Sequence, residues 1–173
     1  MKYTKNKIDS ISFSNHKQIK EWEVLDIRDE NNNKLYFETP FMYLPFGLEK
    51  EYSDYILKLQ FRGVKDDSNS EMKEFYNLIK NFEEKIINLK GIEEKKFKSQ
   101  IIEKNNYDDL LIIKIKKKFF NIDISNSNSE IKNIFDIQKK SQIKCTMHID
   151  NLWSNNKNSI CKFILDKIII YDS

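Results

Sequence analysis

The stretch "FETPFMYLPFGLEKEY", residues 37–52, contains both prolines of the 173-residue chain and one of its three glycines. Proline fixes its own φ and biases the residue before it toward extended backbone. Pro40 and Pro45 therefore predict a stiff bridge between strands. Such a bridge holds its aromatic side chains in place at low entropic cost.

The region before this bridge has the pattern of two strands. Residues 20–28 and 34–39 are β-prone runs on either side of "DENNN", a sequence that tolerates tight turns. We predict that these two runs pair as a hairpin. Residues 1–18 have no comparable pattern and are expected to form a flexible N-terminus.

Alternation of apolar and polar side chains predicts two further strands. Over residues 51–62, Tyr55 lies on the apolar face and Arg62 on the polar face. A second alternating run starts at Asp108. Its polar face forms a positive stripe of three residues: Lys114, Lys116 and Lys118.

Between these strands the period changes to that of a helix. Apolar residues recur at steps of three and four, which places them on one side of an amphipathic α-helix: Met72, Phe75, Ile79, Phe82, Ile86 and Leu89. Ser68 and Glu71 can form a capping box, and Gly91 can end the helix. A weaker helical pattern covers residues 92–105.

The C-terminal region predicts a second hairpin. Residues 141–153 and 159–171 are long β runs around an asparagine-rich turn. Their pairing would place Cys145 near Ile168, and Cys161 near Leu152, so we interpret the two cysteines as free, packed thiols. Residues 121–140 are polar and low in complexity, and we assign them no element.

Composition is consistent with a single α+β domain over residues 1–173, with about six strands and one principal inserted helix. No apolar run is long enough to span a bilayer, and we expect no membrane association. The net charge of +3 is modest. The chain has no alanine and only two arginines, which indicates an A/T-rich genome, so its many lysines are only partly informative about ligands.

Catalytic patterns are absent from the sequence. The three glycines are too far apart to build a glycine-rich phosphate loop. His16 and His148 have no partner at a spacing typical of a metal site or a nucleophile–base pair. We therefore expect no enzymatic activity, no cofactor and no metal.

Nucleic-acid binding is the function for which ingredients exist. Single-strand binders combine positive charge along the backbone with flat rings on which bases stack. The lysine stripe supplies charge, and Trp22, Tyr36, Tyr43, Tyr55 and Trp153 are candidate stacking platforms. The alternative is that alternating lysines keep an exposed strand soluble and that the aromatic residues belong to the core.

A resemblance favours the binding hypothesis. The segments "TPFMYLPFGL", "YSDYILKLQF" and "EFYNLIKNFEEKI", with Trp153 before the final turn, resemble a family of small proteins of nucleocytoplasmic large DNA viruses. That family is similar to phage-type single-stranded DNA-binding proteins. The resemblance covers about residues 22–170. It implies an OB-like antiparallel β-barrel; Phe41 and Phe46 would plug one end of the barrel, and Tyr43 would face outward.

The resemblance also implies a role. The chain would coat single-stranded DNA in viral replication, recombination or repair, in the host cytoplasm (viral factory) or nucleus. Arg62, Lys114, Lys116 and Lys118 would contact phosphates, and Tyr43, Tyr55 and Trp153 would stack on bases. The resemblance leaves open whether the chain also binds other viral replication or virion proteins, and whether it forms a homo-oligomer. The alternative is a virion structural or assembly protein that uses the barrel, the helical stripe or the proline segment for protein contacts.

Overall fold

The computed structural model describes the chain except residues 1, 5–7, 117–121, 127–132 and 172–173. The described residues form an α+β fold of thirteen strands and one α-helix, α1 (Ser70–Lys90). The strands are β1 (Ser12–Ile19), β2 (Trp22–Arg28), β3 (Leu35–Glu38), β4 (Met42–Leu44), β5 (Leu48–Glu51), β6 (Asp54–Gln60), β7 (Ile101–Ile102), β8 (Leu110–Ile115), β9 (Asp123–Ser125), β10 (Ser141–Ile149), β11 (Asn151–Ser154), β12 (Ser159–Ile160) and β13 (Ile164–Ile170). Three short 3-10 helices are η1 (Ile8–Ser10), η2 (Glu94–Lys96) and η4 (Ile134–Asp136).

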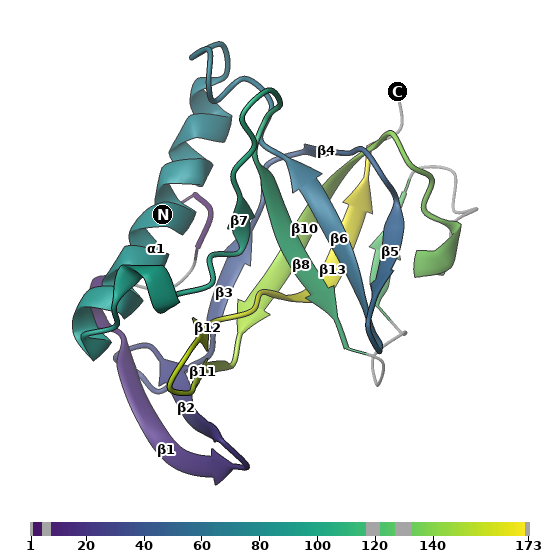
Figure 1. The fold of residues 1–173 in the computed structure, drawn as a ribbon. Helices are drawn as coiled ribbons and strands as arrows, with labels where there is room; N and C mark the ends of the chain where they lie inside the picture. Colours follow the sequence, from purple (N-terminus) through teal and green to yellow (C-terminus); the bar gives the residue numbers. More distant parts are fainter. Residues whose placement is uncertain (1, 5–7, 117–121, 127–132, 172–173) are drawn as a thin grey trace.

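Five strands pair in a closed ring (Figure 1). The order is β4, β6, β8, β13, β10 and back to β4. Only the β8 and β13 pair in this ring is parallel. The predicted alternation in β6 is confirmed, because Leu57 and Leu59 are fully buried inside the fold.

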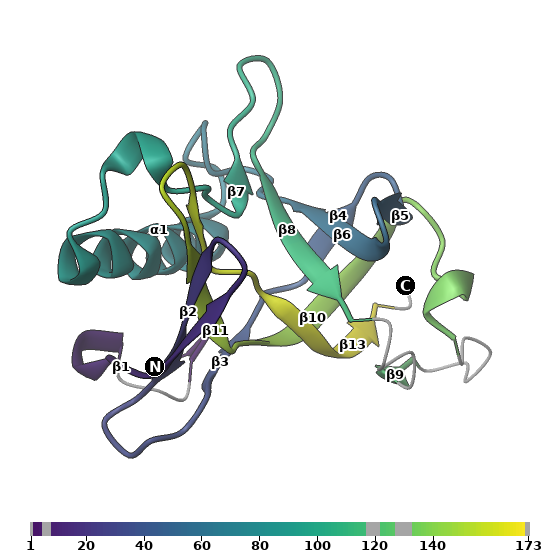
Figure 2. The same ribbon diagram turned by 60° about the horizontal axis from the view of Figure 1, so that its bottom comes forward.

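A smaller sheet lies beside the ring, with strand order β1, β2, β11, β12 (Figure 2). The predicted hairpin of residues 20–28 and 34–39 is therefore wrong: β2 pairs with β1 and β11, whereas β3 pairs with β10 of the ring. The loop between them does turn, held by the Asp29 carboxylate, which accepts hydrogen bonds from the backbone N–H groups of Asn31 and Asn33. It directs the chain from one sheet to the other.

The N-terminal segment also differs from the expectation of flexibility. Strand β1 begins at Ser12 and pairs with β2. Tyr3 is buried against Phe75 of α1, with ring centroids 5.5 Å apart, and its hydroxyl donates to Glu71 at 2.9 Å. The described part of residues 1–18 is thus packed against the fold, because it covers apolar surface that local periodicity alone did not reveal.

Helix α1 confirms the predicted stripe for Met72, Phe75, Ile79, Phe82 and Ile86, which are buried. The last residue of the stripe, Leu89, is 49% exposed because the helix ends one residue later. Gly91 closes the helix at φ 60° as predicted. The N-cap is Asn69, whose Oδ1 accepts from the backbone N–H of Met72 at 3.0 Å, so the predicted Ser68 cap is wrong.

The proline segment forms β4 and its flanks. Met42 and Leu44 point inward and are fully buried. Phe41 and Phe46 are 42% and 55% exposed, so the expectation that they plug the fold is wrong. Side chains alternate along a strand, which turns Phe41 and Tyr43 outward once Met42 and Leu44 face the core.

Thirteen strands form instead of the predicted six. The two C-terminal β runs are each divided between the two sheets, and five further short strands form outside the predicted runs: β1, β4, β5, β7 and β9. The C-terminal run breaks at Asp150, after which the chain leaves the ring as β11. Within the ring, Cys145 lies opposite Ile168 as predicted, and both cysteines are free and buried. Residues 92–105 form η2 and β7, and the predicted second helix is wrong.

Candidate nucleic-acid interface

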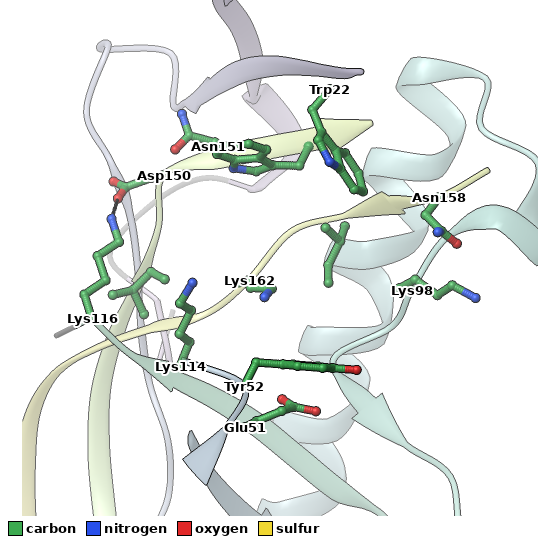
Figure 3. Close-up of a pocket in the computed structure, with 13 residues that line it drawn as sticks. Trp22, Glu51, Tyr52, Lys98, Lys114, Lys116, Asp150, Asn151, Asn158 and Lys162 are labelled. Atoms are coloured by element: carbon green, nitrogen blue, oxygen red, sulfur yellow. Dashed lines mark hydrogen bonds and ion pairs between the residues drawn. The ribbon is translucent and has the colours of Figure 1, made fainter. Parts of the chain in front are cut away.

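A cleft of about 900 Å³ lies where the small sheet meets the ring (Figure 3). Its walls come from β2, β11 and β12 of the small sheet, from the ends of β8 and β13 in the ring, and from the β5–β6 turn. Two tryptophans, a tyrosine, four lysines and two carboxylates are among the thirteen residues that line it: Trp22, Glu51, Tyr52, Lys98, Lys114, Lys116, Asp150, Asn151, Trp153, Asn158, Ile160, Lys162 and Ile164.

Aromatic rings form two sides of the cleft. Trp22 on β2 contacts Trp153 on β11 edge to face, with centroids 6.3 Å apart and ring planes at 70°. Tyr52 stands in the turn between β5 and β6, is 95% exposed, and lies across the cleft from Trp22 (Figure 3). Its positive φ of 54° bends the turn tightly. Aromatic rings therefore stand on two opposite sides of the cleft.

Two of the four lysines are paired with carboxylates. Lys114 Nζ lies 2.9 Å from Asp54 Oδ2, and Lys116 Nζ lies 2.8 Å from Asp150 Oδ2. Both lysines were predicted from the alternation of their strand, which placed them on one face. Their charge is thus already compensated within the protein.

The other two lysines, Lys98 and Lys162, have no carboxylate within ion-pair distance in the described part of the chain. Lys162 points into the space between Tyr52 and Trp22 (Figure 3). Desolvation in the cleft, and then the neighbouring Lys114 charge, lower the pKa of Lys162 below its ordinary value. A phosphate bound beside Lys162 would raise its pKa and so offset the effect of the Lys114 charge.

Lys98 is held in place by a buried anchor. Its backbone N–H donates to the Ser159 carbonyl of β12 at 2.8 Å. The next two residues bind Glu83 of α1: the Ser99 hydroxyl donates to Oε1 at 2.5 Å, and the Gln100 N–H donates to Oε2 at 2.8 Å. Burial raises the pKa of Glu83. The helix therefore positions the cleft wall that carries Lys98.

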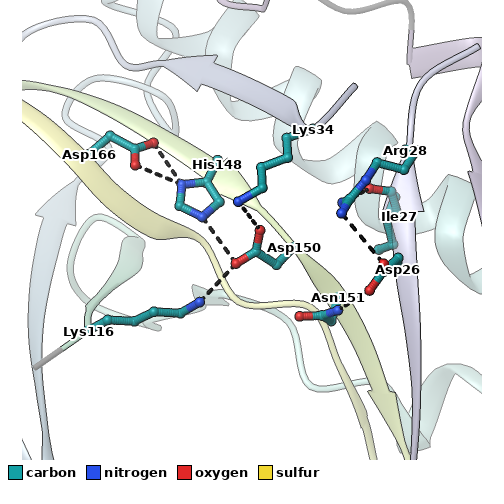
Figure 4. Close-up of polar contacts among 9 residues, drawn as sticks. All are labelled: Asp26, Ile27, Arg28, Lys34, Lys116, His148, Asp150, Asn151 and Asp166. Carbon is teal, nitrogen blue, oxygen red and sulfur yellow. Dashed lines mark hydrogen bonds and ion pairs between the residues drawn. The ribbon is translucent and has the colours of Figure 1, made fainter. Parts of the chain in front are cut away.

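A polar network extends from the edge of the cleft (Figure 4). His148 on β10 is nearly buried, with Nδ1 2.8 Å from both Asp166 oxygens and Nε2 3.2 Å from Asp150 Oδ2. Lys34 Nζ lies 3.0 Å from Asp150 Oδ1. Burial alone would raise the pKa of Asp150, but bonds from the two lysines and the neighbouring His148 outweigh it and hold that pKa well below its usual range.

The remaining predicted site residues lie elsewhere. Arg62 stacks on Tyr43, with its guanidinium carbon 3.5 Å from the ring centroid, and its Nε donates to Gln60. This pair follows the far end of the seven-residue β6, roughly 20 Å from Asp54 at about 3.3 Å per residue. Tyr55 shares the inward face with Leu57 and packs edge to face on Phe135. Lys118 lies outside the described residues.

Of the seven predicted residues, the structure brings three into the cleft: Lys114, Lys116 and Trp153. Trp22 was recognised as a candidate platform but was not included in the predicted site. Lys98, Lys162 and Tyr52 were missed. Of these three, only Tyr52 could have been recognised from the sequence, because an aromatic residue is unusual among the charged and polar residues of a turn. Contacts between distant segments place the two lysines in the cleft.

In the described residues no set of histidine, cysteine, aspartate and glutamate side chains could hold a metal ion. None of the described helices combines the length and apolarity needed to cross a membrane.

Comparison with known proteins identifies the fold. Neither a protein-family model nor a curated protein sequence matches the chain. Among solved structures, the chain is similar to the crystal structure of gp2.5, a single-stranded DNA-binding protein encoded by bacteriophage T7, with a TM-score of 0.51 and 12% sequence identity. The match covers 80% of this chain and 86% of that chain. At this identity the likeness shows a shared fold, and it confirms the resemblance to phage-type proteins at that level.

Proposed function

We propose that this protein binds single-stranded DNA in the cleft, without catalysis, and that its closed ring of strands is an OB-like β-barrel. The observation that carries the proposal is the joint placement, in one concave space, of aromatic rings and of two lysines that have no ion-pair partner among the described residues. A phage protein that binds single-stranded DNA shares the fold, which supports the same conclusion.

The roles follow from the geometry. Lys98 and Lys162 contact backbone phosphates directly, since neither forms an ion pair with a carboxylate of the described residues; Asp54 and Glu51 act on Lys162 only from beyond ion-pair distance. Lys114 and Lys116 also bind a phosphate, once that phosphate replaces their aspartate partners. Trp22, Trp153 and Tyr52 stack on bases, each stack contributing about 1–3 kcal/mol. Stacking accepts any base, so the sequence preference is weak.

The other four predicted site residues stay predictions. Arg62 and Tyr43 would extend the DNA path beyond the cleft, because a guanidinium on an outward ring presents free donors to a phosphate. Lys118 would add charge beyond Lys116. Tyr55, which faces inward, would contact a base only after moving away from Phe135.

The biological setting is proposed from the sequence resemblance. The protein acts in replication, recombination or repair of a large DNA virus, in the cytoplasmic viral factory or the nucleus of the host. Other viral replication or virion proteins are its further partners, with self-association and packaging in the virion as part of the same proposal.

A salt titration tests the proposed function. The affinity for a fluorescein-labelled dT oligonucleotide, measured by anisotropy, is expected to fall with salt with a log-log slope of roughly −0.7 for each phosphate contacted. Two to four lysine contacts therefore predict a slope of about −1.4 to −2.8. Duplex DNA of the same length is the control, and we expect weaker binding because its bases are not free to stack. A flat salt response would contradict the proposal.

A second candidate function is protein assembly. Three aromatic side chains near the proline segment are exposed: Phe41 (42%), Phe46 (55%) and Tyr171 (57%). The ring centroids of Phe41 and Tyr171 lie 5.5 Å apart. These rings favour a protein contact through the proline segment. The helical stripe offers little surface for this purpose, since all of its residues except Leu89 are buried in the core. A virion structural role would be favoured by concentration-dependent self-association without DNA binding.

A further inference from the structure

The small sheet turns one face toward the core and the other toward the cleft. Side chains alternate along a strand, and residues directly opposite each other on paired antiparallel strands share a face. Leu25 of β2 lies opposite Leu152 of β11, and both are buried in the core. Trp22 and Trp153 belong to the other face, where they contact each other and line the cleft. The register of the sheet therefore shows which further side chains share the face of the tryptophans.

That face continues past the cleft onto β1, the neighbour of β2 in the sheet (Figure 2). Trp153 lies opposite Val24, and Val24 lies opposite Lys17 of β1. Trp22 lies opposite Ile19, the last residue of β1. Lys17 and Ile19 thus share a face with the two tryptophans, although neither lines the cleft. Because strands lie about 4.8 Å apart, Ile19 is one strand spacing from Trp22, and Lys17 is two spacings from Trp153.

Both of these side chains are open to solvent. Ile19 is 44% exposed, and Lys17 is exposed and has no ion-pair or hydrogen-bond partner among the described residues. Glu21 stands in the turn that follows, next to a lysine of opposite charge. Further along the same face, Asp26 is compensated by Arg28 at 3.5 Å. The exposed end of the face therefore combines an apolar side chain with an unpaired cation.

We propose that Lys17 and Ile19 of the β1–β2 hairpin form a second contact site for the single strand that leaves the cleft. The inference rests on the proposed function, because the cleft must hold the same strand. Ile19 packs against the sugar or base that follows the one stacked on Trp22, and Lys17 binds the phosphate beyond it. The site lengthens the DNA path across the small sheet and adds one phosphate contact to those of the cleft.

The shape of the β1 edge disfavours a protein strand as the occupant. β1 is the edge strand of its sheet, where free backbone groups could pair with another chain. However, the register shifts between Ser14 and Lys17, and Asn15 has a φ of 52°, so a bulge interrupts the edge. Bulges end or redirect strand pairing. A nucleic-acid strand needs no such backbone ladder, because it binds through charged and apolar side chains on the exposed face.

Oligonucleotides of two lengths separate the hairpin site from the cleft. Anisotropy is measured with labelled dT oligonucleotides of about 4 and about 16 nucleotides, the range of lengths bound by one OB fold. Lys17→Gln and Ile19→Thr should each weaken binding of the long oligonucleotide several-fold and leave binding of the short one nearly unchanged. Thr keeps the β-branched side chain that suits a strand. Lys17→Gln should also make the salt dependence for the long oligonucleotide less steep by about 0.7 log-log units.

Lys85→Gln is the matched control for the loss of charge. Lys85 lies on α1, outside the cleft lining, and it too has no ion-pair partner within the part of the chain that the structure describes. This variant should change neither the affinity for the long oligonucleotide nor its salt dependence. Circular dichroism confirms that all three variants fold.

Site-directed crosslinking tests the location of the strand directly. Both native cysteines are buried, so a cysteine introduced on β1 can be labelled selectively with a photoreactive group. Lys17→Cys and Gln18→Cys place that group on opposite faces of the same strand. We expect several-fold more crosslinking to the long oligonucleotide from position 17 than from position 18.

The outcomes separate the two proposals. Wild-type affinity of Lys17→Gln and Ile19→Thr for the long oligonucleotide, equal losses at both lengths, or equal crosslinking from both faces would overturn the hairpin site and leave DNA binding in the cleft intact. If the short oligonucleotide binds too weakly for comparison, the crosslinking pattern with the long one decides alone. An absence of binding to either oligonucleotide would overturn the proposed function and this inference with it.

Discussion

Two regions of the molecule combine an aromatic ring with a cation, and they differ in shape. In the cleft, Trp22 and Tyr52 face each other across a space that contains Lys162. On the outer face of β4 and β6, Arg62 covers the Tyr43 ring at 3.5 Å. The first arrangement leaves ring faces and an ammonium group open to a ligand from two sides. The second uses the cation to cover the ring, so the same residue types offer less to a polyanion.

Each region contains both paired cations and cations without a carboxylate partner among the described residues. The cleft retains two lysines without carboxylate partners in the described residues, Lys98 and Lys162. On the outer face, Lys58 pairs with Glu49 at 3.4 Å and Lys144 lies 3.9 Å from Glu38. Arg62 on the outer face also has no carboxylate partner among the described residues. Shape, rather than the presence of cations and aromatic rings, therefore distinguishes the cleft in this lysine-rich chain.

The largest expected effect comes from the cleft tryptophans. Replacing Trp22 or Trp153 by Leu should weaken binding of a dT oligonucleotide roughly 5- to 150-fold, the loss expected for one stacked base. Tyr43→Leu on the outer face is the matched change and should cause a smaller loss, because Arg62 already covers one face of that ring. Anisotropy measures both, with circular dichroism to confirm folding. If the cleft variants and Tyr43→Leu lost the same affinity, the cleft would not be the preferred binding surface.

The tryptophans also provide a direct signal. They are the only two of the chain, and both line the cleft. Stacking on a base should therefore quench the intrinsic fluorescence of the wild-type protein on addition of oligonucleotide. Unchanged fluorescence at saturating DNA would place the ligand outside the cleft.

A smaller effect is expected from charge. Lys98→Gln combined with Lys162→Gln should make the salt dependence less steep by about 1.4 log-log units, because two phosphate contacts are lost. Lys58→Gln combined with Lys144→Gln removes the same net charge from lysines that are paired with carboxylates outside the cleft, and should leave the slope nearly unchanged. If the second pair shifts the slope as much as the first, the DNA follows the outer face too.

The smallest expected effect concerns the support of the cleft. Glu83 anchors the segment that carries Lys98, and burial raises its pKa, so its ionisation disfavours the folded state. The wild type should therefore lose stability relative to Glu83→Gln as pH rises from about 4, the ordinary range of a glutamate, through the raised pKa. Thermal unfolding at pH 4 and pH 7 measures the difference. Oligonucleotide affinity at pH 7 should change less than about twofold, since Gln can still accept from one partner.

The sequence was most informative where structure depends on local periodicity. The stripe of α1, the alternation of β6 and the register that sets Cys145 opposite Ile168 were all predictable, because helix and strand geometry fix which side chains share a face. The same alternation identified Lys114 and Lys116 as neighbours on one face. The helix cap Asn69 and the turn residue Asp29 also act locally. The sequence did not single them out, because neighbouring residues have similar hydrogen-bonding groups.

Tertiary structure alone decided which charges are free and where the cleft lies. The aspartates that pair with Lys114 and Lys116 are distant from them in sequence, as Lys98 is from Lys162 and Trp22 is from Trp153. Their proximity depends on the division of the strands between two sheets, which the pattern of any single strand does not specify. Periodicity determines the face that a side chain occupies, whereas the partner it meets there depends on nonlocal pairing.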